Sequence, residues 1–215
     1  MFVLDNLEEV CGEISKRQAM RPDFKQRAKK LGTSYTGTRG TMIVDVVGSR
    51  QRRYTSYVQP KIIKPYADQR DGSLKDLAAN PPTFLRLRGY EVPGMSAVAQ
   101  ALLDYGHGRG LTDEEAICLS WSALPSIHDD KGPHPAVQAV LDVKGIGPAL
   151  LEYLRMLCGA NTLKVDVRVI KSLKAAGVPV HIFTDAGIYE VCRTIAQELG
   201  LSMVELDSLL WLNDE

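Results

Sequence analysis

The stretch LDVKGIGPALLEYLRMLCGANTLKVDVRVIKSL, residues 141–173, carries the most structural information in the chain. Gly145 and Gly147 stand between two segments with helical periodicity, and paired glycines permit the positive φ angles of a sharp turn. Ile146 can point back into the core, and Pro148 suits the first position of the next helix because it has no amide hydrogen. The pattern predicts a helix–turn–helix whose second helix begins with exposed amides, a geometry that binds phosphate. A plain connection between two helices is the other interpretation of these residues.

Helical patterns surround this stretch from residue 74 onward. Capping boxes, in which a Ser or Thr and a Glu three residues later satisfy the first amides of a helix, are expected at Thr112 with Glu115 and at Ser202 with Glu205. Because the connections are short, the helices should pack as a compact all-α body, and the fold class is mainly α. The expected helices cover residues 74–80, 95–106, 112–123, 134–142, 148–158, 167–176, 185–199 and 202–212.

The chain has 215 residues and no net charge, but its charges are unevenly distributed. Residues 16–70 hold fourteen Lys and Arg against three Asp, whereas the residues on either side are acidic overall. Such asymmetry is typical of a segment that binds a polyanion, and a solvated charged face explains it equally well. Residues 16–31 predict basic helical turns interrupted at Pro22.

The segment that follows predicts a different local structure. Residues 41–47 and 53–58 are rich in β-branched and aromatic side chains, which favours two strands of a β-hairpin. The link between them would place Arg50 and Arg52 at the hairpin tip, with Arg53 just beyond it. The expected organisation is therefore a small basic N-terminal region with a β-hairpin, residues 1–73, and a helical domain, residues 74–215.

Residues 143–168 resemble the helix–hairpin–helix and following Asp loop of the endonuclease III-like superfamily of base-excision DNA glycosylases. The family hairpin has the form apolar-Pro-Gly-apolar-Gly and is followed by a helix, a Gly turn and an extended segment ending in Val-Asp-Thr-His. The counterparts here are Val143-Lys144-Gly145-Ile146-Gly147, a helix to Leu157, Gly159 and Val165-Asp166-Val167-Arg168. The resemblance implies a glycosylase-like helical body and duplex DNA as the partner.

Two departures from the family pattern bear on the chemistry. Ala149 stands where bifunctional members carry a catalytic Lys, so Schiff-base chemistry with strand cleavage is not expected. Many relatives end in four closely spaced cysteines that bind an iron–sulfur cluster, and only Cys192 lies beyond the motif here. The chain is therefore expected to use no iron–sulfur cluster, no metal and no other cofactor.

The resemblance makes Asp166 the catalytic carboxylate of a monofunctional DNA glycosylase. Such an enzyme extrudes the target nucleotide, and a carboxylate against its sugar stabilises the developing oxocarbenium charge and orients water. An Asp at this place also suits the N-cap of the following helix, and the two roles are compatible. The residues expected to bind DNA phosphate are Lys144, Gly145, Ile146, Gly147, Lys164 and Arg168, and Arg50, Arg52 and Arg53 are further candidates for DNA contacts.

Two other classes of function remain open at this point. One is a non-catalytic DNA-binding or regulatory protein on the same scaffold, and the other is a helical protein-interaction module. Glu152 and Tyr153 are candidates for lining a base pocket. The four widely spaced cysteines, together with an N-terminus lacking the features of a secretory signal, predict a cytoplasmic protein without a membrane segment.

Overall fold

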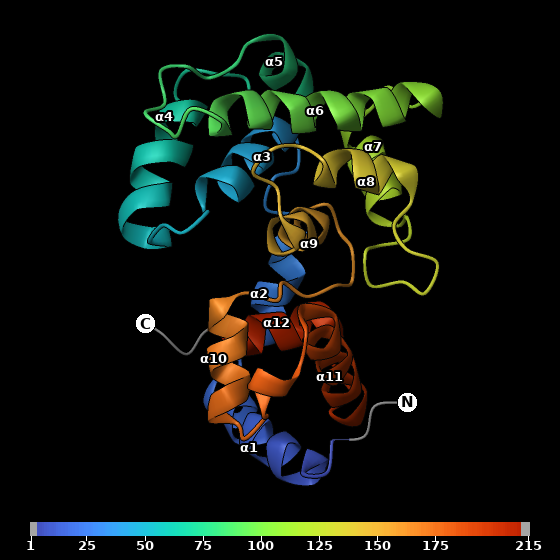
Figure 1. Ribbon diagram of the computed structural model, residues 1–215. Helices are drawn as coiled ribbons and strands as arrows, with labels where there is room; N and C mark the ends of the chain where they lie inside the picture. Colours follow the sequence, from blue (N-terminus) through green and yellow to red (C-terminus); the bar gives the residue numbers. More distant parts are fainter. Residues whose placement is uncertain (1–3, 212–215) are drawn as a thin grey trace. The chain divides into compact units, whose positions relative to one another are not determined.

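The computed structural model describes residues 4–211, and within that range its regular structure is helical (Figure 1). None of these residues forms a strand, so the expected mainly α class is confirmed. None of the helices in the same range is long and apolar enough to span a bilayer. The helices in chain order are α1 Leu7–Met20, α2 Phe24–Leu31, α3 Arg39–Gly48, the π-helix η1 Tyr54–Ile63, α4 Lys64–Ala67, α5 Leu74–Ala79, α6 Glu91–Gly108, α7 Glu114–Ser122, α8 Pro135–Leu141, α9 Pro148–Leu157, α10 Val167–Ala175, the 3-10 helix η2 Val180–Ile182, α11 Asp185–Glu198 and α12 Met203–Trp211.

The chain forms two compact units, which are described separately. The terminal unit combines Met1–Gly32 with Asn161–Glu215, and the central unit is Thr33–Ala160. The boundary expected after residue 73 lies inside the central unit, because α3 packs against α5, α6 and α9 of that unit. The basic segment of residues 16–70 is likewise shared between the two units.

The central unit is built around α3, where the sequence favoured a β-strand. All ten residues of this helix are buried, and it contacts η1, α6 and α9. Figure 1 shows α3 between α6 and α9. Because α3 is buried on every side, its apolar residues are not confined to one face, and it loses the 3.6-residue periodicity that distinguishes a helix from a buried strand. The small intrinsic penalty of Val and Ile in a helix is overcome by this packing.

The expected β-hairpin is therefore wrong in both of its strands. The second of them, residues 53–58, lies at the start of η1, whose Val58 and Ile62 are buried. The residues expected at the hairpin tip form the connection from α3 to η1, and Gln51 within it has a φ of 52°. Arg50, Arg52 and Arg53 thus follow a buried helix instead of projecting from the end of a sheet.

From residue 74 the expected helices are confirmed to within a few residues at most ends, with α6 starting four residues earlier. One of the two capping boxes is also present, since Ser202 and Glu205 bond reciprocally to each other's backbone amides. The other expected capping box, Thr112 with Glu115, is wrong. Asp113 caps α7 instead, by accepting the amide hydrogen of Ala116 at 2.8 Å. The carboxylate of Glu115 binds Arg39.

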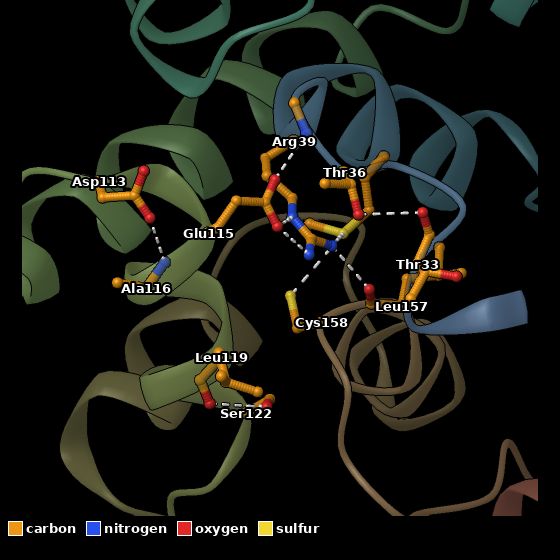
Figure 2. A network of polar contacts seen from close by, with 12 residues as sticks. Thr33, Thr36, Arg39, Asp113, Glu115, Ala116, Leu119, Ser122, Leu157 and Cys158 are labelled. Atoms are coloured by element: carbon orange, nitrogen blue, oxygen red, sulfur yellow. Dashed lines mark hydrogen bonds and ion pairs between the residues drawn. The ribbon is translucent and has the colours of Figure 1, made fainter. Parts of the chain in front are cut away.

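Glu115 binds Arg39, the first residue of α3 (Figure 2). The guanidinium of Arg39 is buried, and its Nε donates to Glu115 Oε2 at 2.9 Å. Its Nη1 donates to the carbonyl of Leu157, the last residue of α9, also at 2.9 Å. This arginine therefore ties the start of α3 to α7 and to the end of α9.

The terminal unit has its own hydrophobic core, formed by α1, α10, α11 and α12. The stripe expected on residues 188–199 is buried as predicted, with Leu199 only partly covered. Arg17 of α1 donates to the hydroxyl of Ser172 in α10 at 2.6 Å, which joins the first helices of the chain to its last third. The core side chains include Val10, Ile14, Val169, Leu173, Ile188, Cys192, Ile195, Leu206 and Leu209.

The close approach of α3 to the loop before α5 gives a first prediction. A Cβ at Gly40 would lie 2.2 Å from the carbonyl oxygen of Ser73, and backbone atoms cannot move aside as a side chain can. We expect Gly40→Ala to lower the free energy of unfolding by about 1–3 kcal/mol, the range for overpacking. Urea unfolding followed by circular dichroism measures it. The control is Gly108→Ala in α6, whose Cβ would meet nothing within 4 Å, and an equal effect there would refute the steric account.

Candidate nucleic-acid interface and carboxylate site

The turn between α8 and α9 has the geometry expected from its two glycines. Gly145 has a φ of 100°, which a residue with a Cβ adopts only under strain. Ile146 is 8% exposed, and its amide donates to the carbonyl of Val143 at 2.9 Å, which closes the turn. Gly147 is the N-cap of α9 and Pro148 its first residue. Because Gly147 has no side chain to accept hydrogen bonds, the first amides of α9 can bind an external acceptor.

Three basic side chains accompany this turn, and we call Arg50, Arg88 and Lys144 the hairpin cation cluster. They are joined by Tyr90. The guanidinium of Arg50 lies 5.2 Å, and the Lys144 ammonium 5.9 Å, from the centre of the Tyr90 ring. Arg50 also donates to the carbonyl of Gly145 at 3.4 Å, and Arg88 donates to the Tyr90 hydroxyl at 3.4 Å. Cation–π contacts of this kind place positive charges together without neutralising them.

The other two arginines of the expected hairpin tip differ from Arg50. Arg52 forms two hydrogen bonds to the carboxylate of Glu91, at 3.1 and 2.7 Å, and a third to the carbonyl of Gly48. Because Glu91 is 1% exposed, Arg52 neutralises a buried charge inside the fold. Arg53 is exposed.

A buried carboxylate fixes the elements that carry these groups. Asp45 of α3 is 1% exposed, and its Oδ2 accepts hydrogen bonds from the hydroxyls of Tyr35, Tyr54 and Tyr153 at 2.7, 3.0 and 3.1 Å. Burial, followed by the charge of Asp45, raises the pKa of all three phenols, so they remain protonated donors. Tyr153, a candidate for a base pocket, therefore links α9 to α3 and η1. Glu152, the other such candidate, is 1% exposed.

Asp166 lies in the terminal unit, where it is the N-cap of α10. Its Oδ1 accepts the amide hydrogens of Arg168 and Val169 at 2.9 and 3.1 Å. Its Oδ2 lies 3.4 Å from Nζ of Lys164, and the two side chains are 19% and 16% exposed. The cap fixes the rotamer of the carboxylate, so one oxygen is used by the helix and the other is directed at an ammonium group.

A second carboxylate lies behind this pair. Asp207 of α12 accepts the backbone amide hydrogen of Lys164 at 3.0 Å and is 6% exposed. Burial raises the pKa of Asp207 to about 7; the negative charge of Asp166 adds to the rise, and the Lys164 hydrogen bond opposes it. The hydrogen bond from the Lys164 amide to Asp207 holds the extended segment that leads into Asp166.

Arg168, expected at a phosphate, stacks on an aromatic ring. Its guanidinium carbon lies 4.2 Å from the centre of the Trp211 indole, a close cation–π contact. Both side chains are half-buried.

The structure thus brings together two groups of the expected residues. Lys144, Gly145, Ile146 and Gly147 meet Arg50 in the central unit, whereas Lys164, Asp166 and Arg168 lie together in the terminal unit.

Three residues of these two groups were not expected from the sequence: Arg88, Tyr90 and Asp207. Arg88 and Tyr90 precede α6 in a segment without periodicity, so no pattern placed them beside the turn. Asp207 lies between the buried Leu206 and Leu209 of α12, but the same helix also carries Glu205 and Ser208, so no pattern in the sequence marks this one acidic residue as buried.

Comparisons of the chain with protein-family models, with curated proteins and with solved structures found no match to any of them.

Proposed function

We propose that this protein binds duplex DNA through the turn between α8 and α9 and acts as a monofunctional DNA glycosylase with Asp166 as its carboxylate. The observation that carries the proposal is the turn itself, where Gly145 has a positive φ and the uncapped start of α9 lies beside the hairpin cation cluster. Amides at a helix start, with the positive end of the helix dipole, form a site for a phosphate oxygen. Lys144 is exposed, and its charge adds to that attraction.

A phosphate at this site would position the duplex without reading its sequence. Backbone amides and basic side chains contact phosphates in the same way for every base pair. The attraction is local to this cluster of positive charges, which agrees with a chain of zero net charge. Recognition of the target base then depends on extruding it from the stack, since its glycosidic bond is inaccessible in the duplex.

Asp166 has the chemistry for the step that follows. Departure of the base leaves positive charge on the sugar, and a carboxylate with a fixed rotamer stabilises that charge without having to reorganise. The two amides on Oδ1 supply the fixed rotamer, and Oδ2 is the oxygen able to orient a water molecule. The product would be an abasic site in an otherwise intact strand.

A second function, DNA binding without catalysis, is favoured by one specific observation. Both oxygens of Asp166 have structural partners, the amides of α10 and the ammonium of Lys164. A carboxylate used in this way stabilises the start of a helix whether or not it acts on a sugar.

Binding to DNA is tested by its dependence on salt. We expect log K for a duplex of random sequence to fall linearly with log salt concentration, and Lys144→Ala to reduce the magnitude of that slope by about 1, the value for one lost phosphate contact. Fluorescence anisotropy from low to moderate salt measures both. Lys75→Ala, an exposed lysine of α5 in the same unit, is the control and should leave the slope unchanged. Equal slopes for all three proteins would remove the turn from the interface.

A further inference from the structure

Sulfur-bearing side chains from three elements meet inside the central unit, and we call Met42, Cys118 and Cys158 the sulfur cluster. Met42 belongs to α3, Cys118 to α7, and Cys158 is the C-cap of α9. The Sγ of Cys158 lies 3.8 Å from the Sδ of Met42, and the Cys158 thiol is also hydrogen-bonded to the thiol of Cys118. None of the three residues is more than 1% exposed. Because Cys158 contacts both of the others, the three soft donor atoms are within reach of a single ion.

Arg39 brings positive charge to the sulfur cluster. Its Nη1 donates to the Met42 sulfur at 3.6 Å, and its guanidinium interacts electrostatically with both cysteine sulfurs. Figure 2 shows the Cys158 sulfur directed toward this guanidinium. A buried thiolate is costly unless a positive charge compensates it, and Arg39 supplies that charge. The carboxylate of Glu115, which also binds Arg39, belongs to a side chain that is 34% exposed, so water screens part of its opposing charge.

The donor atoms determine which kind of ion the sulfur cluster suits. Thiolate and thioether sulfurs are soft ligands that favour Cu(I), whereas Mg²⁺ and Ca²⁺ bind to oxygen. Zn²⁺ in a structural site takes four ligands from Cys, His, Asp and Glu. Among residues 4–211, no group of three such side chains is placed to hold a metal ion, so zinc lacks its usual ligands here. A soft monovalent ion with two thiolates and one thioether is therefore the ion that fits.

We propose that the sulfur cluster binds one Cu(I) ion in a trigonal arrangement, with Cys118, Cys158 and Met42 as its ligands. At a metal–sulfur distance of about 2.3 Å, the length of a zinc–thiolate bond, three sulfurs in a plane around the ion lie about 4 Å apart. The 3.8 Å between Cys158 and Met42 is close to that separation. The ion replaces the two thiol protons, which pass to solvent, and no oxidant or reductant takes part. Two thiolates with a monovalent ion leave one negative charge, which Arg39 offsets.

The two cysteines lie close to the surface along the chain, which gives an ion a short path to them. Leu119, the residue after Cys118, is 63% exposed, and Gly159, the residue after Cys158, is also exposed. Leu119 and Gly159 are neighbours in space, because a Cβ built on Gly159 would lie 3.4 Å from Cδ1 of Leu119. The sequence analysis expected no metal because the ligands come from separate helices, and no local spacing of cysteines marks them.

The test uses the full-length reduced protein and Cu(I) held by the coloured chelator bicinchoninate under nitrogen. We expect one equivalent of Cu(I) to pass to the wild-type protein, with loss of the colour as the measurement. Cys118→Ala and Cys158→Ala should abolish the transfer, whereas Cys192→Ala, at a buried cysteine of the terminal unit, should leave it unchanged. Met42→Leu conserves the side-chain volume and removes the thioether. It should weaken binding by about 10–100-fold, the loss seen even for an outer partner of a metal ligand.

Circular dichroism before loading shows which variants keep the fold, and X-ray absorption of the loaded wild-type protein should show three sulfurs about 2.3 Å from the copper. A folded wild-type protein that takes no Cu(I) from bicinchoninate would overturn the proposal. So would equal transfer to wild type and a folded Cys158→Ala variant, or nitrogen and oxygen ligands in the absorption spectrum. If the cysteine variants do not fold, Met42→Leu decides, since an affinity equal to that of wild type would contradict the trigonal site. None of these results depends on DNA binding or base excision.

Discussion

Replacing Asp166 by Asn is expected to lower the rate of base excision by about 100-fold or more, the usual loss when a charged group at the reacting centre is removed. Asn is neutral, so it cannot stabilise positive charge on the sugar or accept a proton. Its side-chain oxygen still accepts the amide hydrogens of Arg168 and Val169, because Asn and Asp are equally good N-caps. The fold should persist while the chemistry is lost. Single-turnover excision on a duplex that the wild-type protein cleaves measures the effect.

A matched control for this variant is Asp23→Asn, which replaces an exposed aspartate at the N-cap of α2 in the same unit. It should leave excision unchanged. Excision that survives Asp166→Asn at the wild-type rate would show that the carboxylate only caps α10.

Replacing Asp207 by Asn is expected to stabilise the protein at pH 8 by up to about 4 kcal/mol, since each unit of pKa shift corresponds to about 1.4 kcal/mol. The pKa of Asp207 is raised from 3.8 to about 7 in the folded protein. Folding therefore takes up a proton between these two values, and the wild-type protein loses stability as the pH rises from about 4 to about 7. Asn carries no charge to desolvate, and its oxygen can still accept the Lys164 amide hydrogen.

The pH dependence identifies the cause of this effect. At pH 4 and below, Asp207 is protonated in the folded state and the variant should be close to the wild-type protein in stability. Urea unfolding at pH 4, 6 and 8 measures the difference. Asp185→Asn, at the exposed first residue of α11, is the control, and it should destabilise slightly because it removes a negative charge from a helix N-terminus. An Asp207→Asn variant less stable than wild type at pH 8 would contradict the account.

The helices from residue 74 onward were predictable because each buries one face. Their apolar residues recur at helical spacing, and Pro, Gly and capping residues mark their ends. The helix α3 was not predictable by the same reasoning. Burial on every side removes the periodicity, and a short run of Val and Ile then favours a strand on local propensity alone.

The charge pattern was only partly informative. Residues 16–70 are strongly basic, but several of their cations are used inside the fold. Arg39 binds Glu115, Arg52 binds Glu91 and Arg70 binds Asp76, each acidic partner lying outside the basic segment. A count along the chain records the sign of each residue but not its partner, so it overstates the positive charge available to a polyanion.

The candidate site shows the same limit. The turn at Gly145 and the cap at Asp166 follow from local patterns, because turns and caps are determined by residues close in sequence. The contacts that complete each group do not. Tyr90 meets Arg50 and Lys144, and Asp207 meets Lys164, across separations of about 40 residues or more. Only tertiary packing brings such residues together.

Abasic-site formation on duplexes that each carry one alkylated, oxidised, deaminated or mismatched base tests the proposed glycosylase activity most directly. After incubation with the full-length protein and treatment with hot alkali, we predict cleavage at the modified base in at least one class of duplex and none in the undamaged duplex. The opposite result, salt-dependent binding to every duplex without an abasic site in any of them, would contradict the glycosylase proposal and support DNA binding without catalysis.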